Sequence, residues 1–180
     1  PEDFVAQVRY MFVRMAAELD APLEVVNDGE VTALAGSMAL GKNGVLGIAM
    51  GTSEGGGYID MDGNVTTWLS ELAFAPVDLH PEAPADEWSG DLGVGAQYFS
   101  QQAVARLLPA SGIEYDASLS MPEQLKIVQK LMEKGDERAL KIYDAIGIYL
   151  GYTLAHYAEF YEFQYVLLLG RVTTGPGGEH

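Results

Sequence analysis

The segment Gly51 to Gly57, which reads Gly-Thr-Ser-Glu-Gly-Gly-Gly, is the part of this sequence whose residues most directly suggest ligand chemistry. It separates two apolar runs, and glycines in a strand cost stability because they lose much backbone entropy and pack nothing. Successive backbone N–H groups without bulky side chains can donate hydrogen bonds to phosphate oxygens. A glycine-rich hairpin bend would explain the same residues, so this segment alone leaves both interpretations open.

A polar pair, Asn27 and Asp28, follows the two valines at 25–26. A carboxylate at the carboxyl end of a buried strand lies where α/β folds place their sites. Asp28 could act as a general base on a substrate hydroxyl, and the amide of Asn27 could bind a neighbouring hydroxyl. Asn and Asp are also good helix caps. Spacing alone favours a cap for the helix that begins near Gly29.

Two further segments contain candidate ligand-binding residues. Glu71 lies in the apolar stretch 68–78, where an isolated carboxylate is costly unless it finds a partner. A sugar hydroxyl could be that partner, although such a residue more often points to solvent or accepts from a backbone donor. Gly170 follows the apolar run 165–169 and opens a glycine-rich turn. That turn could support an adenine or a ribose, and a plain loop explains it equally well.

Composition bounds the class of protein. The chain has 180 residues, 48% of them hydrophobic, which is enough for one domain with a substantial core. Its net charge of −16 disfavours binding to a nucleic-acid backbone. No apolar run is long enough to predict a membrane span. The absence of cysteine removes disulfides and cysteine-ligated zinc sites. We therefore expect a cytoplasmic protein with no nucleic-acid or membrane partner.

Hydrophobic periodicity predicts an alternation of helices and strands, which is typical of an α/β fold. The predicted helices span 1–22, with Asp3 as its cap, then 29–41, 96–108, 121–135 and 136–162. The predicted strands span 23–28, 44–51, 56–61, 64–69 and 164–170. A turn at Asp62 and Gly63 joins two of these strands into a hairpin, and residues 75–95 form a long loop.

Taken in order, four stretches resemble the ROK sugar-kinase family (repressors, open reading frames, kinases) of the actin-like ATPase superfamily. They are PLEVVNDGEVTALAGSMALG, GIAMGTSEGGGYIDMDGNV, WLSELAFAPVD and LLLGRV. That family shows an Asn-Asp pair before an alanine-rich helix, a Gly-Thr-Gly-x-Gly-Gly-Gly phosphate loop, a Glu-x-Gly-His segment and a Gly-Gly turn. The resemblance implies one α/β unit over 1–180 with a ribonuclease-H-like mixed sheet and flanking helices. This unit would be mostly the large C-terminal lobe, with a helix-strand-helix at 1–41 carrying Asp28.

The resemblance also implies a reaction, the transfer of a phosphoryl group from ATP, with Mg²⁺ carried on the nucleotide, to a sugar hydroxyl. Asp28 matches the catalytic base, and Asn27 and Glu71 match sugar ligands. The residues that match the nucleotide-binding positions are Gly51, Thr52, Ser53, Gly55, Gly56, Gly170 and Arg171. The partners implied are a sugar and ATP, and the protein could form a homodimer.

The sequence departs from the family pattern at several positions. Ser53 stands where the family has glycine, Glu54 brings a carboxylate close to the expected phosphates, and Arg171 replaces the second glycine of the adenosine turn. Phe74 stands where the family has a sugar-binding and often zinc-binding histidine. The cysteine cluster of the family is also missing from this sequence, so we expect no zinc. The family's Asp-x-Gly-x-Thr motif is also missing, which predicts a fragment that is inactive alone. The alternatives are a non-enzymatic sugar-binding or transcription-regulatory ROK-like protein, and a scaffold that binds neither ligand.

Overall fold

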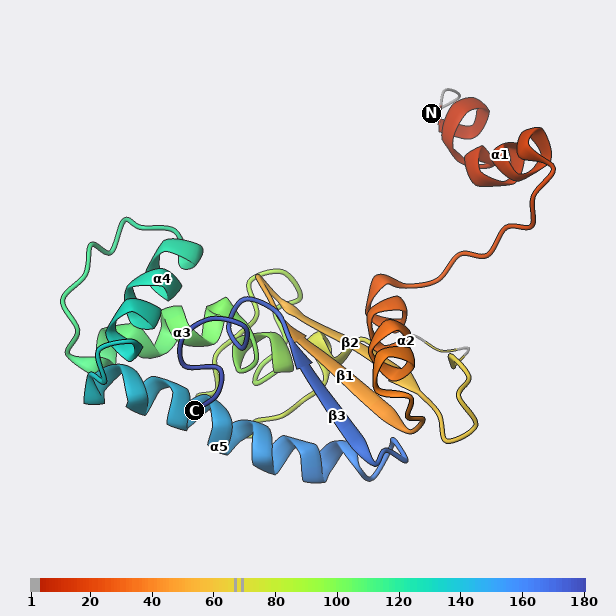
Figure 1. Cartoon of the computed structure of the whole chain (residues 1–180). Helices are drawn as coiled ribbons and strands as arrows, with labels where there is room; N and C mark the ends of the chain where they lie inside the picture. Colours follow the sequence, from red (N-terminus) through yellow and green to blue (C-terminus); the bar gives the residue numbers. More distant parts are fainter. Residues whose placement is uncertain (1–3, 67, 69) are drawn as a thin grey trace.

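The computed structural model describes residues 4–66, 68 and 70–180 and shows an α/β fold around a mixed three-stranded sheet (Figure 1). The strands are β1 (Val45–Met50), β2 (Glu54–Ile59) and β3 (Tyr165–Leu169), in the order β2-β1-β3. β2 runs antiparallel to β1, and β3 runs parallel to it. The mixed sheet with flanking helices agrees with the sequence prediction, and the strands at 44–51 and 164–170 are confirmed within about one residue.

Helices cover both faces of the sheet. Helix α2 (Asp28–Leu40) packs on one face, where Ala33, Val45 and Ile59 form a small buried cluster. The main core lies on the other face, where Leu46 and Ile48 of β1 meet the remaining helices. These helices are α3 (Gln101–Leu107), α4 (Met121–Met132) and α5 (Glu137–Tyr157). Alternate residues of β1 therefore serve two cores, as the period of two in a strand requires.

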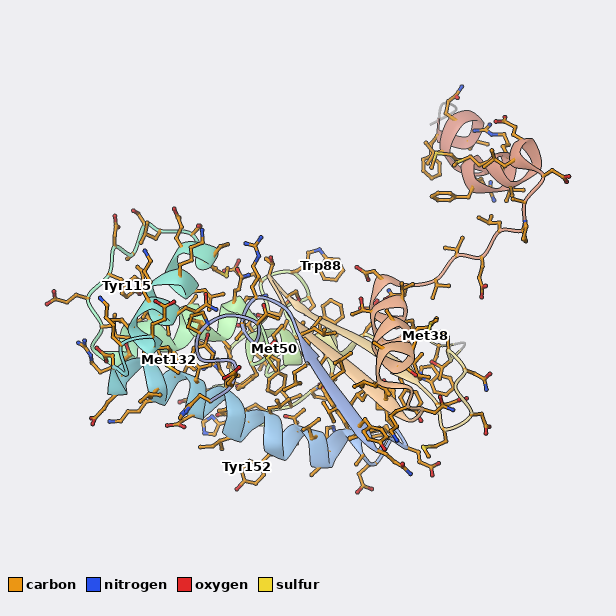
Figure 2. All side chains as sticks on the ribbon, in the orientation of Figure 1. Met38, Met50, Trp88, Tyr115, Met132 and Tyr152 are labelled. Carbon is orange, nitrogen blue, oxygen red and sulfur yellow. The ribbon has the colours of Figure 1, made fainter. Side chains whose placement is uncertain are left out.

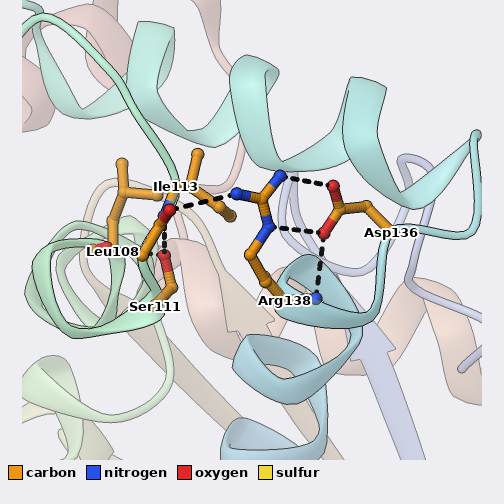
Figure 3. Close-up of polar contacts among 6 residues, drawn as sticks. Leu108, Ser111, Ile113, Asp136 and Arg138 are labelled. Atoms are coloured by element: carbon orange, nitrogen blue, oxygen red, sulfur yellow. Dashed lines mark hydrogen bonds and ion pairs between the residues drawn. The ribbon is translucent and has the colours of Figure 1, made fainter.

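Side-chain caps define where the later helices begin. Ser120 and Glu123 form a reciprocal capping box at the start of α4. Asp136 caps α5 by accepting a hydrogen bond of 2.9 Å from the backbone N–H of Arg138. The guanidinium of Arg138 in turn binds the Asp136 carboxylate at 2.7 Å and the carbonyl oxygen of Gly112 at 3.0 Å (Figure 3). These contacts tie the start of α5 to the end of the α3 region and lower the pKa of Asp136 to about 2.

The N-terminal region differs from the sequence prediction. A π-helical turn (Phe4–Val8) and helix α1 (Met11–Leu19) replace one continuous helix, and the predicted cap Asp3 lies outside the described residues. The predicted strand at 23–28 is wrong, because its residues before Asp28 form no regular element and reach α2 as an exposed link (Figure 1). A strand needs a neighbour that accepts and donates its backbone hydrogen bonds. No described strand pairs with this segment.

Two further boundaries were predicted only in part. The turn at Asp62 and Gly63 is present, but the strand predicted at 64–69 is reduced to one bridge between Val65 and Ile59, and residues 67 and 69 lie outside the described residues. The helix predicted at 96–108 begins only at Gln101, after a 3₁₀ turn. No helix in the described part of the chain has the length and apolarity to cross a membrane.

Candidate functional site

A cavity of about 370 Å³ lies beside the carboxyl ends of the parallel strands β1 and β3. Open α/β sheets commonly bind ligands at this edge. Segments far apart in sequence converge there, namely the start of α2, the β1–β2 turn, residues 70–71 and the end of β3. The predicted site residues that line the cavity are Asn27, Asp28, Gly51, Ser53, Gly55, Gly56, Glu71 and Gly170. Thr52 and Arg171 are the two predicted site residues that do not line it.

Asn27 is the N-cap of α2. Its side-chain oxygen accepts a hydrogen bond of 2.8 Å from the backbone N–H of Gly29, and its backbone is extended. Asp28 is the first helical residue, and its exposed carboxylate lies at the positive end of the helix dipole. The capping alternative is therefore confirmed for Asn27. Asp28 is not the cap, and it is one of the residues that line the cavity.

The three consecutive glycines lie inside β2, which corrects the expectation that they form a loop. Gly55, Gly56 and Gly57 pair with residues of β1 in a regular antiparallel ladder. A Cβ atom at Gly57 would collide with the backbone of Gly29 and come within 2.8 Å of the Glu30 nitrogen. The glycines thus let the start of α2 rest on β2 at backbone contact. The glycines therefore permit the close approach of helix α2. Gly55 and Gly56 also line the cavity.

The loop at this edge of the sheet is the three-residue turn Gly51, Thr52 and Ser53. The N–H of Gly51 donates to the carbonyl of Ser53 at 3.0 Å, and the Gly51 carbonyl accepts from the N–H of Gln101 at 2.9 Å. The second bond anchors the turn to the start of α3. Thr52 and Ser53 are exposed at the tip of this turn, so their backbone is accessible to a ligand there.

Glu54, the residue after the turn, is buried within the main core side of β2. Its position in the strand puts it on the same face as Tyr58, and its carboxylate lies against Gly95 and near the phenol of Tyr157. Neither carboxylate oxygen, nor the Tyr157 hydroxyl, has a hydrogen-bond partner of good geometry. Burial raises the pKa of Glu54 to about 8, and the nearby Tyr157 opposes the shift only in part. Glu54 is among the residues that line the cavity, and its raised pKa disfavours a negative charge beside the expected phosphates.

Sequence reasoning missed Ser70, which is buried and lines the cavity, and Glu30, which is buried in contact with it. The N–H of Ser70 donates to a Glu30 carboxylate oxygen at 3.3 Å. The other Glu30 oxygen and the Ser70 hydroxyl have no hydrogen-bond partner. Glu30 stands three residues after the cap Asn27, where a capping box places a glutamate, but its carboxylate accepts from the Ser70 N–H, so this spacing does not indicate the observed contact.

The remaining predicted residues occupy different surroundings. Glu71 is exposed and precedes a 3₁₀ turn (Leu72–Phe74), which agrees with the solvent-facing alternative. Phe74 packs against Trp88 with ring centroids 5.4 Å apart and does not line the cavity. Gly170 has a φ of +92°, and a Cβ there would lie 2.5 Å from the carbonyl oxygen of Met50, so the position requires glycine.

Arg171 lies away from the main cavity, although it was predicted to bind the nucleotide. Its carbonyl accepts a hydrogen bond of 2.9 Å from the Gln129 side chain, and Arg171 lines a separate cavity of about 280 Å³ beside α4. No lysine, arginine or histidine is among the residues that line the main cavity, whereas Asp28 and Glu71 contribute exposed carboxylates. No group of three metal-ligating side chains occurs within the described ranges. A phosphate bound here would depend on backbone N–H groups and on a cation that it brings with it.

Comparison with solved structures places this geometry in a known fold. A ROK hexokinase from Thermus thermophilus matches with a TM-score of 0.71 and 23% identity over 91% of this chain and 53% of its own. A ROK glucokinase from Streptomyces griseus, in complex with glucose and AMPPNP, matches with a TM-score of 0.69 and 20% identity over 91% and 57%. This chain has the ROK fold. No family model matches the sequence, and no curated protein matches it.

The ROK fold includes proteins of more than one function. A ROK transcriptional regulator, a homologue of the E. coli MLC protein, matches with a TM-score of 0.68 and 19% identity over 88% of this chain and 41% of its own. The chain thus spans about half the length of the ROK structures that it matches. Because a kinase and a regulator share the fold, the fold leaves the activity to be argued from the site.

Proposed function

We propose that this chain is part of a ROK-type sugar kinase, which transfers the γ-phosphoryl group of ATP to a sugar hydroxyl. The observation that carries the proposal is the convergence of Asn27, Asp28, Glu71, Gly170 and the 51–53 turn on one cavity. A structure of the same fold holds glucose and AMPPNP, a sugar together with an ATP analogue, which supports the ligand classes.

Asp28 is the proposed general base. The sugar hydroxyl oxygen attacks the γ-phosphorus, its proton passes to the Asp28 carboxylate, and ADP leaves with the electrons of the broken P–O bond. Asn27 uses its side-chain oxygen for the helix cap. Its NH₂ group can still donate to a neighbouring sugar hydroxyl. Glu71, which is exposed and lines the same cavity, accepts a hydrogen bond from another hydroxyl of the sugar.

The nucleotide would lie between the 51–53 turn and Gly170. Backbone N–H groups of the turn can donate to phosphate oxygens, and the absence of a side chain at Gly170 leaves room beside it. Phosphoryl transfer needs neutralisation of phosphate charge. The cavity lining has no lysine or arginine, so Mg²⁺ that enters with ATP supplies this charge. In this proposal Thr52 contacts the phosphates through its backbone alone. Arg171 does not line the cavity, so it could contact only a part of the nucleotide that extends outside it.

The test is Asp28→Asn in a catalytically active protein that contains this chain. General-base assistance is worth about 10²–10⁴-fold, so kcat should fall by about that factor while the KM for the sugar changes much less. The melting temperature should fall only slightly, because Asn27 and not Asp28 caps the helix and only the dipole interaction of the Asp28 carboxylate is lost. Unchanged turnover would reject Asp28 as the base. Asn27→Asp, which retains a capping oxygen but loses the NH₂ donor, should instead raise the KM for the sugar and leave the melting temperature unchanged.

A sugar-binding regulator is the second candidate. Phe74 packs on Trp88 where the family pattern has a sugar-binding histidine, and a ROK regulator shares the fold. Calorimetric titration with a panel of hexoses and with Mg²⁺–AMPPNP separates the two functions. A kinase binds both ligands, whereas a regulator of this kind binds a sugar and shows no heat with the nucleotide.

A further inference from the structure

Glu30 is a buried carboxyl beside the candidate site that the proposed reaction does not use. It lies in the first turn of α2, two residues after Asp28, and is 2% exposed. One of its side-chain oxygens accepts the hydrogen bond from the backbone N–H of Ser70, and the other has no hydrogen-bond partner. A buried carboxyl with so few hydrogen bonds is costly, because it has lost its contact with water and gained little in return. We therefore expect this residue to serve a contact that the site requires.

The hydrogen bond between Glu30 and Ser70 passes beside β2, which is the strand at one edge of the sheet. Successive residues of a strand face opposite sides, so Gly56 and Gly57 mark the two faces of β2. A Cβ at Gly57 would collide with the carbonyl oxygen of Gly29, at the start of α2. A Cβ at Gly56 would lie 2.5 Å from the carbonyl oxygen of Ser70. The start of α2 and the segment at Ser70 therefore lie against opposite faces of β2, and Glu30 joins them.

The contact at Ser70 fixes the backbone from which the Glu71 side chain extends. The N–H of Leu72 donates to the Ser70 carbonyl at 2.9 Å, which closes a tight turn around Glu71. The Glu71 carbonyl accepts from the N–H of Phe74 at 3.1 Å, and Leu72 is buried in the main core. The backbone of Glu71 is therefore held on one side by the core and on the other side by Glu30.

In the described part of the chain, helix α2 is packed from one side only. Residues 21–26, which lead into it, are exposed and form no regular element (Figure 1). Met38 is 76% exposed, and Figure 2 shows it on the side of α2 that faces away from the sheet. The inner side of the helix packs on the sheet. The position of Asp28 relative to the rest of the site therefore depends on the contact of α2 with β2 and on the Glu30 hydrogen bond.

We propose that Glu30 is a positioning residue, which sets the separation of Asp28 and Glu71 by binding the Ser70 backbone. The inference rests on the proposed function, in which Asp28 is the base and Glu71 binds the sugar in the same cavity. A sugar held by both groups must match their separation, because hydrogen bonds need donor–acceptor distances of about 2.7–3.2 Å. Without the Glu30 contact, the segment at Glu71 loses an anchor, whereas α2 keeps its contact with β2. The loss therefore weakens sugar binding equally in the ground state and the transition state, which raises KM and leaves kcat nearly unchanged.

The first experiment compares three substitutions of Glu30 in a catalytically active protein that contains this chain. Glu30→Gln keeps an oxygen that can accept from the Ser70 N–H, whereas Glu30→Ala removes it and Glu30→Asp withdraws it by one methylene. We expect the KM for the sugar to rise about tenfold in the Ala and Asp variants, as for one lost hydrogen bond, and to stay near the original value in Glu30→Gln. The kcat should change by less than about twofold in all three.

Val128→Ala is the control for a general loss of stability. Val128 is buried in α4, within the main core and outside the cavity lining, so the substitution should lower the melting temperature and leave the KM unchanged. A KM that rises equally in Glu30→Ala and Val128→Ala, or that does not change in Glu30→Ala, overturns the positioning role.

The second experiment requires no activity and uses the 180-residue chain. Amide hydrogen exchange of residues 70–74 should be faster in Glu30→Ala than in the original and in Glu30→Gln, while exchange in α4 and α5 should not change. Unchanged exchange at 70–74 overturns the proposal, whatever the protein does. Faster exchange together with normal sugar turnover and an unchanged KM rejects the positioning role alone. If the original protein neither binds nor phosphorylates any of a panel of hexoses, the proposed function is rejected, and the role of Glu30 in it as well.

Discussion

Glu54→Gln is the substitution whose effect follows most directly from the structure. The Glu54 carboxyl is buried among Gly95, Leu72 and Tyr157, and no hydrogen bond of good geometry satisfies its oxygens. Glutamine has nearly the same shape but cannot ionise. The substitution therefore removes the cost of a buried charge and leaves the packing almost unchanged.

The magnitude and its sign come from proton linkage. Burial raises the pKa of Glu54 from 4.5 in the unfolded chain to about 8 in the folded protein. The folded state therefore holds a proton that the unfolded state releases. The contribution of this bound proton to the free energy of unfolding is fully present below pH 4.5 and is lost as the pH rises through 8. At 1.36 kcal/mol for each pKa unit, the loss is about 3 kcal/mol at pH 7 and about 5 kcal/mol above pH 8. A whole domain is stable by only about 5–15 kcal/mol.

The assay is urea unfolding of the original and the Glu54→Gln proteins at pH 5, 6, 7, 8 and 9. The free energy of unfolding of the original should fall relative to the variant by about 1.4 kcal/mol for each pH unit between pH 5 and 8. Other groups titrate equally in both proteins, so the difference isolates Glu54. Glu71→Gln, which removes an exposed carboxylate from the same cavity, is the control and should keep the original slope. Parallel curves for the original and Glu54→Gln would refute the burial argument.

Three further predictions test other contacts. Asn27→Ala should lower stability by about 1 kcal/mol through loss of the α2 cap, which is roughly 2–4 °C in melting temperature, and Asn27→Asp should not, as thermal melting would show. Gly57→Ala should lower the free energy of unfolding by about 1–3 kcal/mol, because its Cβ collides with the start of α2. Gly147→Ala, in open space on α5, is the control and should raise it by about 0.5–1 kcal/mol. Equal effects of the two substitutions in urea unfolding would contradict the close approach of α2 to β2. Elemental analysis of tag-free protein should find no stoichiometric zinc, since the chain has no cysteine and only three histidines, and one zinc per chain would refute this.

Features that depend on neighbours in the sequence were predicted well. The helix at 29–41, the turn at Asp62 and Gly63 and the apolar strands β1 and β3 all agree with the structure, and of the two possible caps, Asn27 and Asp28, the structure uses Asn27. Each depends on interactions within a few residues, such as the hydrogen bond that the Gly29 N–H donates to the Asn27 side chain, or on a continuous apolar run that is typical of a buried strand. The resemblance to ROK proteins also led to the observed fold.

The errors arose where a residue's partner lies far away in the chain. Residues 23–26 have the valine content of a strand but find no strand to pair with, so their backbone stays outside the sheet. The sequence suggests that Glu54 is a charge beside a loop, yet the register of β2 turns it towards Tyr157, more than a hundred residues away, and desolvation raises its pKa to about 8.

The sequence by itself determined the helices, the main strands and the residue types available for chemistry, because periodicity and capping act locally. Only the tertiary structure decided that Gly57 accommodates the backbone of Gly29, and that Gly170 reaches the cavity shared by Asp28 and the 51–53 turn. These arrangements depend on which surfaces pack together, since burial, strand pairing and backbone clashes are properties of segments brought together from distant parts of the chain.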